Sequence, residues 1–352
     1  MNKENFTYIE GLNLEKLKSA LTENNVEKYR AEQIFNWVHN HLVFDFDGMI
    51  NLPKQLRVEL NGKYKIISLS KEVDHFSNHT KTKKFLFKTF DDKEIESVII
   101  PEEKRNTLCL STQVGCPLDC KFCATGLMGY KRNLSSAEIV SQYLLTAKEY
   151  GKSFITNIVY MGMGEPLLNF DNTIESLVIF TNELNNILSR NRITVSTSGI
   201  PHKIVELADS NLRVKLALSL HSAYNDIRDI IMPINKKYRL EENLEAIKYY
   251  AKKTKTRITF EYTMLKGIND RKEDIKGLAR ICSQVPSKVN LIPFNSIAHM
   301  QPDGISAELI PTEKTKIYEF AQALRDKNVT VMIRDTQGDD IAAACGQLAI
   351  TR

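Results

Sequence analysis

Short runs of apolar and β-branched residues alternate with helical patterns from residue 107 almost to the end of the chain. Seven runs are typical of buried strands: 107–112, 155–161, 192–197, 213–219, 257–263, 288–292 and 329–334. Six stretches between them have the period of amphipathic helices: 135–149, 171–184, 201–209, 240–253, 272–283 and 312–327. Such an alternation implies an α/β fold with a parallel sheet, and its length predicts a partial (β/α)6-type barrel.

The first part of the chain has a different pattern. Helices are predicted around 12–21, over 29–41 and after Pro53, followed by strand-like runs at 83–90 and 95–100 that can pair as a hairpin. We therefore predict a small, mainly helical accessory domain over residues 1–90, with a hairpin linker. Residues 91–352 then form the barrel and a C-terminal catalytic segment.

Three cysteines lie close together directly after the first predicted barrel strand. Cys116, Cys120 and Cys123 have the spacing C-x3-C-x2-C. Three thiolates in so short a loop can hold a 4Fe-4S cluster and leave one iron without a protein ligand. A zinc site is the alternative, but it needs a fourth ligand, and the nearest histidines are His79 and His202. An open iron suits an enzyme that binds a small molecule there and passes it one electron.

Other polar or glycine-rich segments follow the later strands. They are 162–165 after the second strand, 196–199 after the third, 219–221 after the fourth, Asn295 after the sixth and Cys345 after the last. Because parallel barrel strands end on one rim, these segments are predicted to meet at the C-terminal mouth of the barrel. Taken singly, each has an ordinary interpretation, such as turn glycines or a serine that binds local backbone.

The cysteine loop, with its aromatic Phe122 before the last cysteine, resembles that of the radical S-adenosylmethionine (SAM) enzymes. The surroundings narrow the resemblance: Cys109 upstream, and the segments 29–34, 162–167 and 338–348. Together they resemble the RlmN/Cfr family of dual-specificity RNA methyltransferases, which act on carbon atoms of adenosine. The resemblance extends over nearly the whole chain.

The resemblance implies cofactors and site residues. The cluster ligands are Cys116, Cys120 and Cys123, and two SAM molecules are used per turnover. The SAM site comprises Gly164, Glu165, Ser196, Ser219, Leu220, His221 and Asn295. The catalytic residues are Glu96, Cys109 and Cys345, although by residue type alone Glu96 is one acid in a strand and Cys109 a small strand residue.

The implied chemistry needs two cysteines because carbon 2 of adenine is electron-poor and cannot attack a sulfonium methyl group. Cys345 takes a methyl group from one SAM, and a radical generated from a second SAM removes a hydrogen atom from that methyl group. The resulting carbon radical adds to the ring. Cys109 then attacks the sulfur of Cys345 and releases the methylated base as a disulfide forms. The family pattern marks Glu96 as the acceptor of the ring proton, a task that Cys109 could share.

Which carbon is methylated divides the family. The Cfr branch modifies carbon 8, confers antibiotic resistance and has Gly-Glu-Ala-Leu and Ser-Thr-Ile-Gly where this chain has Gly-Glu-Pro-Leu at 164–167 and Ser-Thr-Ser-Gly at 196–199. The chain thus follows the carbon 2 branch. The implied partners are 23S rRNA, the adenosine beside the anticodon of some tRNAs, and a one-electron donor such as flavodoxin. An iron–sulfur electron carrier and a zinc RNA-binding module are alternatives outside enzymes, but a carrier has no use for an open iron or Cys345.

Charge and hydropathy add little. The net charge of +5 is compatible with an RNA partner but decides nothing. Lys81, Lys83, Lys84 and Lys88 form a local basic cluster, which fits either a solvated strand edge or, as the resemblance favours, contact with RNA. The chain has no run of 18 apolar residues and no apolar signal core, so we expect a cytoplasmic protein without a membrane partner.

Overall fold

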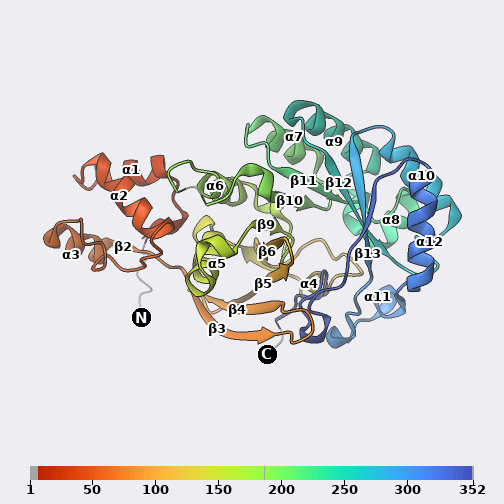
Figure 1. Cartoon of the computed structure of the whole chain (residues 1–352), viewed down its shortest axis with the longest axis horizontal. Helices are drawn as coiled ribbons and strands as arrows, with labels where there is room; N and C mark the ends of the chain where they lie inside the picture. Colours follow the sequence, from red (N-terminus) through yellow and green to blue (C-terminus); the bar gives the residue numbers. More distant parts are fainter. Residues whose placement is uncertain (1–6, 186, 351–352) are drawn as a thin grey trace.

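A computed structural model of the protein describes residues 7–185 and 187–350. Its main feature is one sheet of ten strands within these residues, in the order β14-β13-β12-β11-β10-β9-β6-β5-β4-β3 (Figure 1). Seven strands run parallel: β6 (Arg105–Cys109), β9 (Asn157–Tyr160), β10 (Ile193–Thr197), β11 (Lys215–Ser219), β12 (Ile258–Met264), β13 (Ser287–Pro293) and β14 (Val331–Ile333). Three antiparallel strands extend the sheet beyond β6: β5 (Glu94–Glu102), β4 (Lys83–Thr89) and β3 (Leu69–Phe76).

Helices between the parallel strands cover the outer face of this curved sheet (Figure 1). They are α5 (Ser136–Tyr150), α6 (Phe170–Phe180), α7 (Pro201–Asp209), α9 (Leu240–Thr254), α10 (Lys272–Cys282) and α12 (Lys314–Arg325). Helix α5 begins with a capping box between Ser135 and Glu138. The predicted α/β partial barrel is therefore confirmed.

Several short elements were not predicted because they have too few residues to show a period. They are α4 (Ala124–Leu127), α8 (Asn225–Ile231), α11 (Gly304–Glu308), and the hairpin of β7 (Gln113–Gly115) and β8 (Tyr130–Asn133). Strand β3 was also missed, since most of its residues are exposed and polar. Elements α4, β7 and β8 flank the cysteine loop and so help to fix its course.

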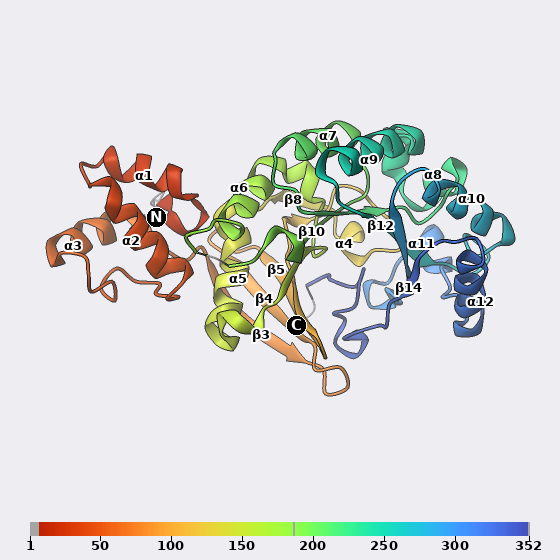
Figure 2. The same ribbon diagram turned by 45° about the horizontal axis from the view of Figure 1, so that its top comes forward.

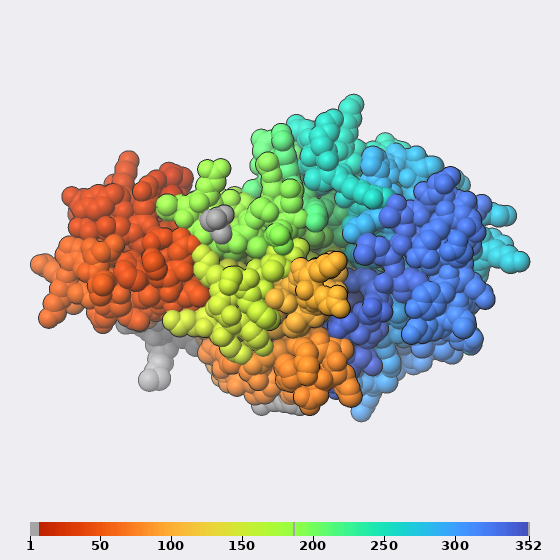
Figure 3. Space-filling view, viewed as in Figure 1, coloured from red at the N-terminus to blue at the C-terminus, as the bar shows by residue number. Residues whose placement is uncertain are grey.

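The helices α1 (Leu14–Thr22), α2 (Lys28–His39) and α3 (Lys54–Lys63) form a lobe that projects from one end of the molecule (Figures 2 and 3). Short strands β1 (Thr7–Tyr8) and β2 (Tyr64–Lys65) pair at its base. Strands β3 and β4 follow the lobe and join the barrel sheet, so the sheet extends across the predicted boundary at residue 90. That boundary remains a prediction. Among the described residues, no helix has the length and hydropathy needed to cross a membrane.

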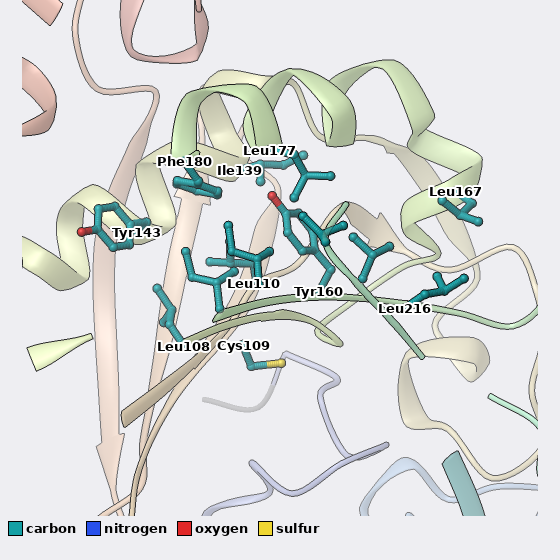
Figure 4. Close-up of a cluster of buried hydrophobic side chains, with 14 of the residues drawn as sticks. Leu108, Cys109, Leu110, Ile139, Tyr143, Tyr160, Leu167, Leu177, Phe180 and Leu216 are labelled. Carbon is teal, nitrogen blue, oxygen red and sulfur yellow. The ribbon is translucent and has the colours of Figure 1, made fainter. Parts of the chain in front are cut away.

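Strand β6 separates the apolar core from the interior of the barrel. Leu108 and Leu110 point into a cluster beneath α5 and α6, whereas the sulfur of Cys109 points to the other side of the strand (Figure 4). Successive side chains of a strand face opposite sides, so the apolar neighbours determine where Cys109 points. The core thus presents this thiol to the inside of the barrel.

The four lysines of the predicted basic cluster do not form one basic patch. Lys83 pairs with Asp74 and Glu149, and Lys88 pairs with Asp92. Lys84 lies on the side of β4 opposite to Lys83 and is buried. The expectation that these lysines act together on RNA is wrong for Lys84, because its side chain points into the protein.

Candidate active site

Segments that follow the parallel strands meet in a cavity. Most residues of the implied cluster and SAM sites line it: Cys116, Cys120, Cys123, Gly164, Glu165, Ser196, Ser219, His221 and Asn295. The predicted catalytic residue Cys345 lines it too. Leu220 is the exception, because its side chain is fully buried behind the wall. The topology therefore brings together residues that are far apart in the sequence.

The cysteine loop presents three thiols to this cavity. Burial raises the pKa of Cys116 to about 12, and the nearby Cys123 adds to the effect; burial also raises the pKa of Cys120. Among the described residues, no three His, Cys, Asp or Glu side chains are grouped closely enough for a single metal ion. Three thiols that face one cavity can each bind one corner of a 4Fe-4S cluster.

Gly164 allows Glu165 to enter the cavity wall. Gly164 has φ +98, a left-handed conformation, and a Cβ atom there would lie 2.5 Å from the side chain of Gln113. The Glu165 carboxylate accepts hydrogen bonds from the backbone N–H groups of Ser198 at 2.8 Å and Leu167 at 3.1 Å. Its pKa is raised by burial. A carboxylate fixed in this way can accept a further bond from an ammonium group.

His221 is a neutral hydrogen-bond donor in this site. Its Nδ1 accepts a hydrogen bond from the backbone N–H of Thr263 at 2.9 Å, which assigns the proton to Nε2. Burial lowers the pKa of His221 to about 3, and the charge of Arg228 contributes. The ring also packs on Phe122 of the cysteine loop, with 4.5 Å between centroids. These contacts suit a binding residue and do not suit a general base.

Arg228 organises the site and was missed by sequence reasoning. This side chain is fully buried and donates to the backbone carbonyls of Ser198, Ser219 and Leu220. It thereby ties the ends of β10 and β11 together. Burial lowers its pKa to about 10, so the guanidinium stays charged at neutral pH. No local signal identifies it, because an arginine in a short helix usually faces solvent.

Two further unpredicted residues, Glu261 and Arg334, line the same cavity. Oε1 of Glu261 accepts a hydrogen bond from Asn290 at 3.0 Å. Its Oε2 is buried and has no hydrogen-bond partner among the described residues. An unsatisfied buried acceptor in a cavity wall is costly unless a ligand completes it. The cavity therefore has the properties of a site for a polar small molecule.

A second cavity, with an empty volume of about 650 Å³, adjoins the first. Cys109 lines it, and Cys345 lines both cavities. Burial raises the pKa of Cys109 to about 12, with Cys345 adding to the effect, and burial raises the pKa of Cys345 to about 11. The side chain of Cys345 is exposed, and it faces the two cavities. The structure thus brings the two predicted catalytic cysteines together.

Glu96, the third predicted catalytic residue, lies elsewhere. Its carboxylate is buried between β4 and the C-terminal segment, and it is not among the described residues that line either cavity. It pairs with Lys84 at 3.0 Å and accepts from the backbone N–H of Ala349 at 3.0 Å. Asn295 also contacts the segment, since its amide donates to the carbonyl of Cys345 at 3.0 Å.

Comparisons with known proteins place this site in a family. The Radical SAM superfamily matches residues 110–279, and the ribosomal RNA large subunit methyltransferase N-terminal domain matches residues 7–66. A protein of Thermotoga neapolitana, named probable dual-specificity RNA methyltransferase RlmN, is 46% identical over 97% of this chain and 97% of its own length. The chain belongs to the RlmN family of radical SAM methyltransferases.

Other members of the RlmN family agree with this assignment. A dual-specificity RNA methyltransferase RlmN of Pelobacter propionicus is 42% identical over 97% of this chain and 95% of its own length. The crystal structure of a radical SAM methyltransferase from Sphaerobacter thermophilus, 38% identical, superposes with a TM-score of 0.91 over 97% of this chain and 99% of that one. The resemblance found in the sequence is therefore confirmed. The radical SAM family implies a 4Fe-4S cluster and SAM, and the three cavity thiols and the unsatisfied Glu261 oxygen fit them.

Proposed function

We propose that this protein methylates carbon 2 of an adenosine in the peptidyl-transferase centre of 23S rRNA, and the adenosine beside the anticodon in some tRNAs. The observation that carries the proposal is the position of Cys345, which lines both cavities and shares the second with Cys109. A carrier thiol between a cofactor site and a substrate site can receive a group on one side and deliver it on the other.

Residues of the first cavity would hold the cofactors. Cys116, Cys120 and Cys123 would bind the 4Fe-4S cluster. The buried Glu165 carboxylate is placed to accept from the SAM ammonium group, and the Nε2–H of His221 can donate to a ligand oxygen. When bound, the cluster and SAM supply a methyl group and a radical route to an electron-poor carbon. The scheme consumes two SAM molecules per turnover.

Cys345 carries the methyl group. Its thiol loses a proton, and its sulfur takes up the methyl group by displacement to form a thioether. The methyl carbon later bonds to carbon 2 of the adenine, so the RNA becomes attached to the protein through the Cys345 sulfur. This bond forms after the methyl group has lost one hydrogen atom, and it leaves an unpaired electron on the ring. The ring then gives up its carbon 2 proton to a base and one electron to a one-electron acceptor.

Cys109 releases the product. Its thiolate attacks the Cys345 sulfur, a sulfur–sulfur bond forms, and the carbon–sulfur bond breaks. The electron pair of that bond stays on the carbon, which takes up a proton and becomes the methyl group of the base. The disulfide between the two cysteines must be reduced before the next turnover. The shared cavity provides the close approach that this exchange needs.

The choice of carbon 2 over carbon 8 rests on the residues beside Glu165 and before Gly199. Pro166 begins a short 3-10 turn, and Ser198 donates its backbone N–H to the Glu165 carboxylate. Both residue types follow the carbon 2 branch, whereas the alternative is a Cfr-type carbon 8 enzyme that confers antibiotic resistance. Family membership favours an enzyme over an iron–sulfur carrier or a zinc module.

The remaining partners belong to the same proposal. The helical lobe, within the proposed accessory domain of residues 1–90, would help to hold structured RNA, and residues 91–352 would carry out the chemistry. A one-electron donor such as flavodoxin would reduce the cluster. The protein would act in the cytoplasm, where rRNA and tRNA are found.

Nucleoside mass spectrometry tests the function directly. Ribosomal and transfer RNA from cells with and without the protein are digested to nucleosides, and the methyladenosines are separated by position. We expect 2-methyladenosine to disappear with the protein and to return with the wild-type gene but not with Cys345→Ala. Appearance of 8-methyladenosine in place of 2-methyladenosine would assign the protein to the other branch.

A further inference from the structure

Lys84 of β4 and Glu96 of β5 form an ion pair in the interior of the protein. Their side chains are 1% and 0% exposed, and Nζ lies 3.0 Å from Oε1. Taking two charges out of water is costly, so a buried ion pair is by itself weak evidence for stability, and its other contacts must show its role. Neither Lys84 nor Glu96 is among the described residues that line the two cavities.

Both members of the pair contact the segment that carries Cys345. The backbone N–H of Ala349 donates to Oε2 of Glu96 at 3.0 Å, and Lys84 donates to the carbonyl of Ala342 at 3.5 Å. These two contacts lie on either side of Cys345 in the sequence.

The segment from Gly338 to Ile350, called here the carrier segment, has little structure of its own. Its one regular element in the described chain is the 3-10 turn Asp339–Ile341. Gly338, Ala342, Gly346 and Ile350 have positive φ angles. For Ala342 and Ile350, which have a Cβ atom, this conformation is unfavourable and persists only when neighbours impose it. The shape of the carrier segment therefore depends on contacts from outside it.

We infer that Lys84 and Glu96 are positioning residues, which hold the carrier segment so that Cys345 faces both cavities. The inference rests on the proposed function, in which Cys345 carries the methyl group. Glu96 is then not the acceptor of the ring proton, because its two carboxylate oxygens bind Lys84 and Ala349 away from the substrate cavity. The acceptor is instead a group that faces the second cavity, as Cys109 does.

Hydrogen exchange of the full-length protein without cofactors tests the positioning role. In Glu96→Gln and Lys84→Met, peptides covering the carrier segment should exchange about tenfold to a hundredfold faster, as expected when a hydrogen bond to a charged group is lost. The matched control is Lys83→Met, because Lys83 is adjacent on β4 and pairs with Asp74 and Glu149 instead. Unchanged exchange in both pair variants would overturn the inference.

The fraction of methylated Cys345 distinguishes a positioning role of Glu96 from a role as the acceptor of the ring proton. In protein isolated with its cluster, Glu96→Gln and Lys84→Met should each reduce the fraction of methylated Cys345 severalfold, because the thiol is no longer held at the first cavity. A glutamate that serves only as the base for the ring proton predicts full methylation of Cys345 in Glu96→Gln, with the block after RNA attachment. That result would also overturn the inference.

A neutral pair provides the last test and remains informative if a single variant folds poorly. In Lys84→Gln with Glu96→Gln, two amides can keep both backbone contacts without a buried unpaired charge. We expect the double variant to recover Cys345 methylation and RNA methylation relative to Glu96→Gln. A double variant with full Cys345 methylation but no RNA product would show that Glu96 is the base. If wild-type Cys345 is never methylated, the proposed function fails, while the exchange result still decides the positioning role.

Discussion

Replacing Cys109 by alanine should trap the RNA on the protein. The variant still has Cys345 and all three cluster ligands, so it should take up the methyl group and form the bond to adenine. It lacks the sulfur that breaks the bond to the carrier, so the RNA stays attached whether or not the ring proton has been removed. We therefore expect covalently attached RNA to accumulate, approaching one RNA per protein molecule.

The size of the effect follows from the surroundings of Cys109. The residue is 8% exposed, and removing one buried sulfur atom costs about 1 kcal/mol, a small part of the roughly 5–15 kcal/mol that stabilises a folded domain. The fold should therefore persist. A thiol in the same cavity has an effective concentration on the order of 1 M or more, so an added thiol at about 1 mM should release RNA at least a thousandfold more slowly.

The assay is denaturing electrophoresis of the purified protein before and after nuclease treatment. A slowly migrating species that nuclease removes is the expected result for Cys109→Ala, and it should be absent when Cys345→Ala is added. Cys282→Ala is the matched control, because Cys282 is partly buried in α10 and lines neither cavity. Normal turnover by Cys109→Ala, or free RNA beside methylated Cys345, would refute the two-cysteine release.

Cys120→Ala should lose both the cluster and all methylation, measured by iron content and RNA product; a variant that still cleaves SAM would contradict the ligand assignment. Protein with an intact cluster should carry about 14 extra mass units on Cys345 before it meets RNA, and finding them on Cys109 would reverse the two roles. Burial raises the pKa of Cys109 to about 12, so only a small fraction of this thiol is ionised at neutral pH. In the wild-type protein, the rate at which methylated RNA is released from its covalent adduct with Cys345 should therefore rise about tenfold per pH unit from pH 7 to 9. A plateau in this range would argue against a buried resolving thiol. Arg228→Met should lower the free energy of unfolding by about 3 kcal/mol and weaken SAM binding, measured by urea denaturation and calorimetry, because three backbone carbonyls lose a charged donor; unchanged binding would remove Arg228 from the site.

The local pattern of the chain determined the elements of the barrel and the chemistry of its cysteine loop. The parallel strands are short runs rich in apolar and β-branched residues, whereas the covering helices are amphipathic, so the two patterns can be distinguished in the sequence. The order of strands and helices then places every strand end on one rim. The cysteine ligands could be found because all three lie within one short loop, between Cys116 and Cys123.

The tertiary structure alone decided which polar groups are buried and what they bind. Lys83 and Lys84 are adjacent residues of the same type. Lys84 is nevertheless buried beside Glu96, whereas Lys83 forms an ion pair with Glu149 near the surface. Arg228 looks like any helix arginine until α8 packs on the ends of β10 and β11. Local periodicity reports only the burial of whole faces, whereas these hydrogen bonds join groups far apart in the sequence. Their partners exist only once the sheet has curved and the carrier segment has closed against it.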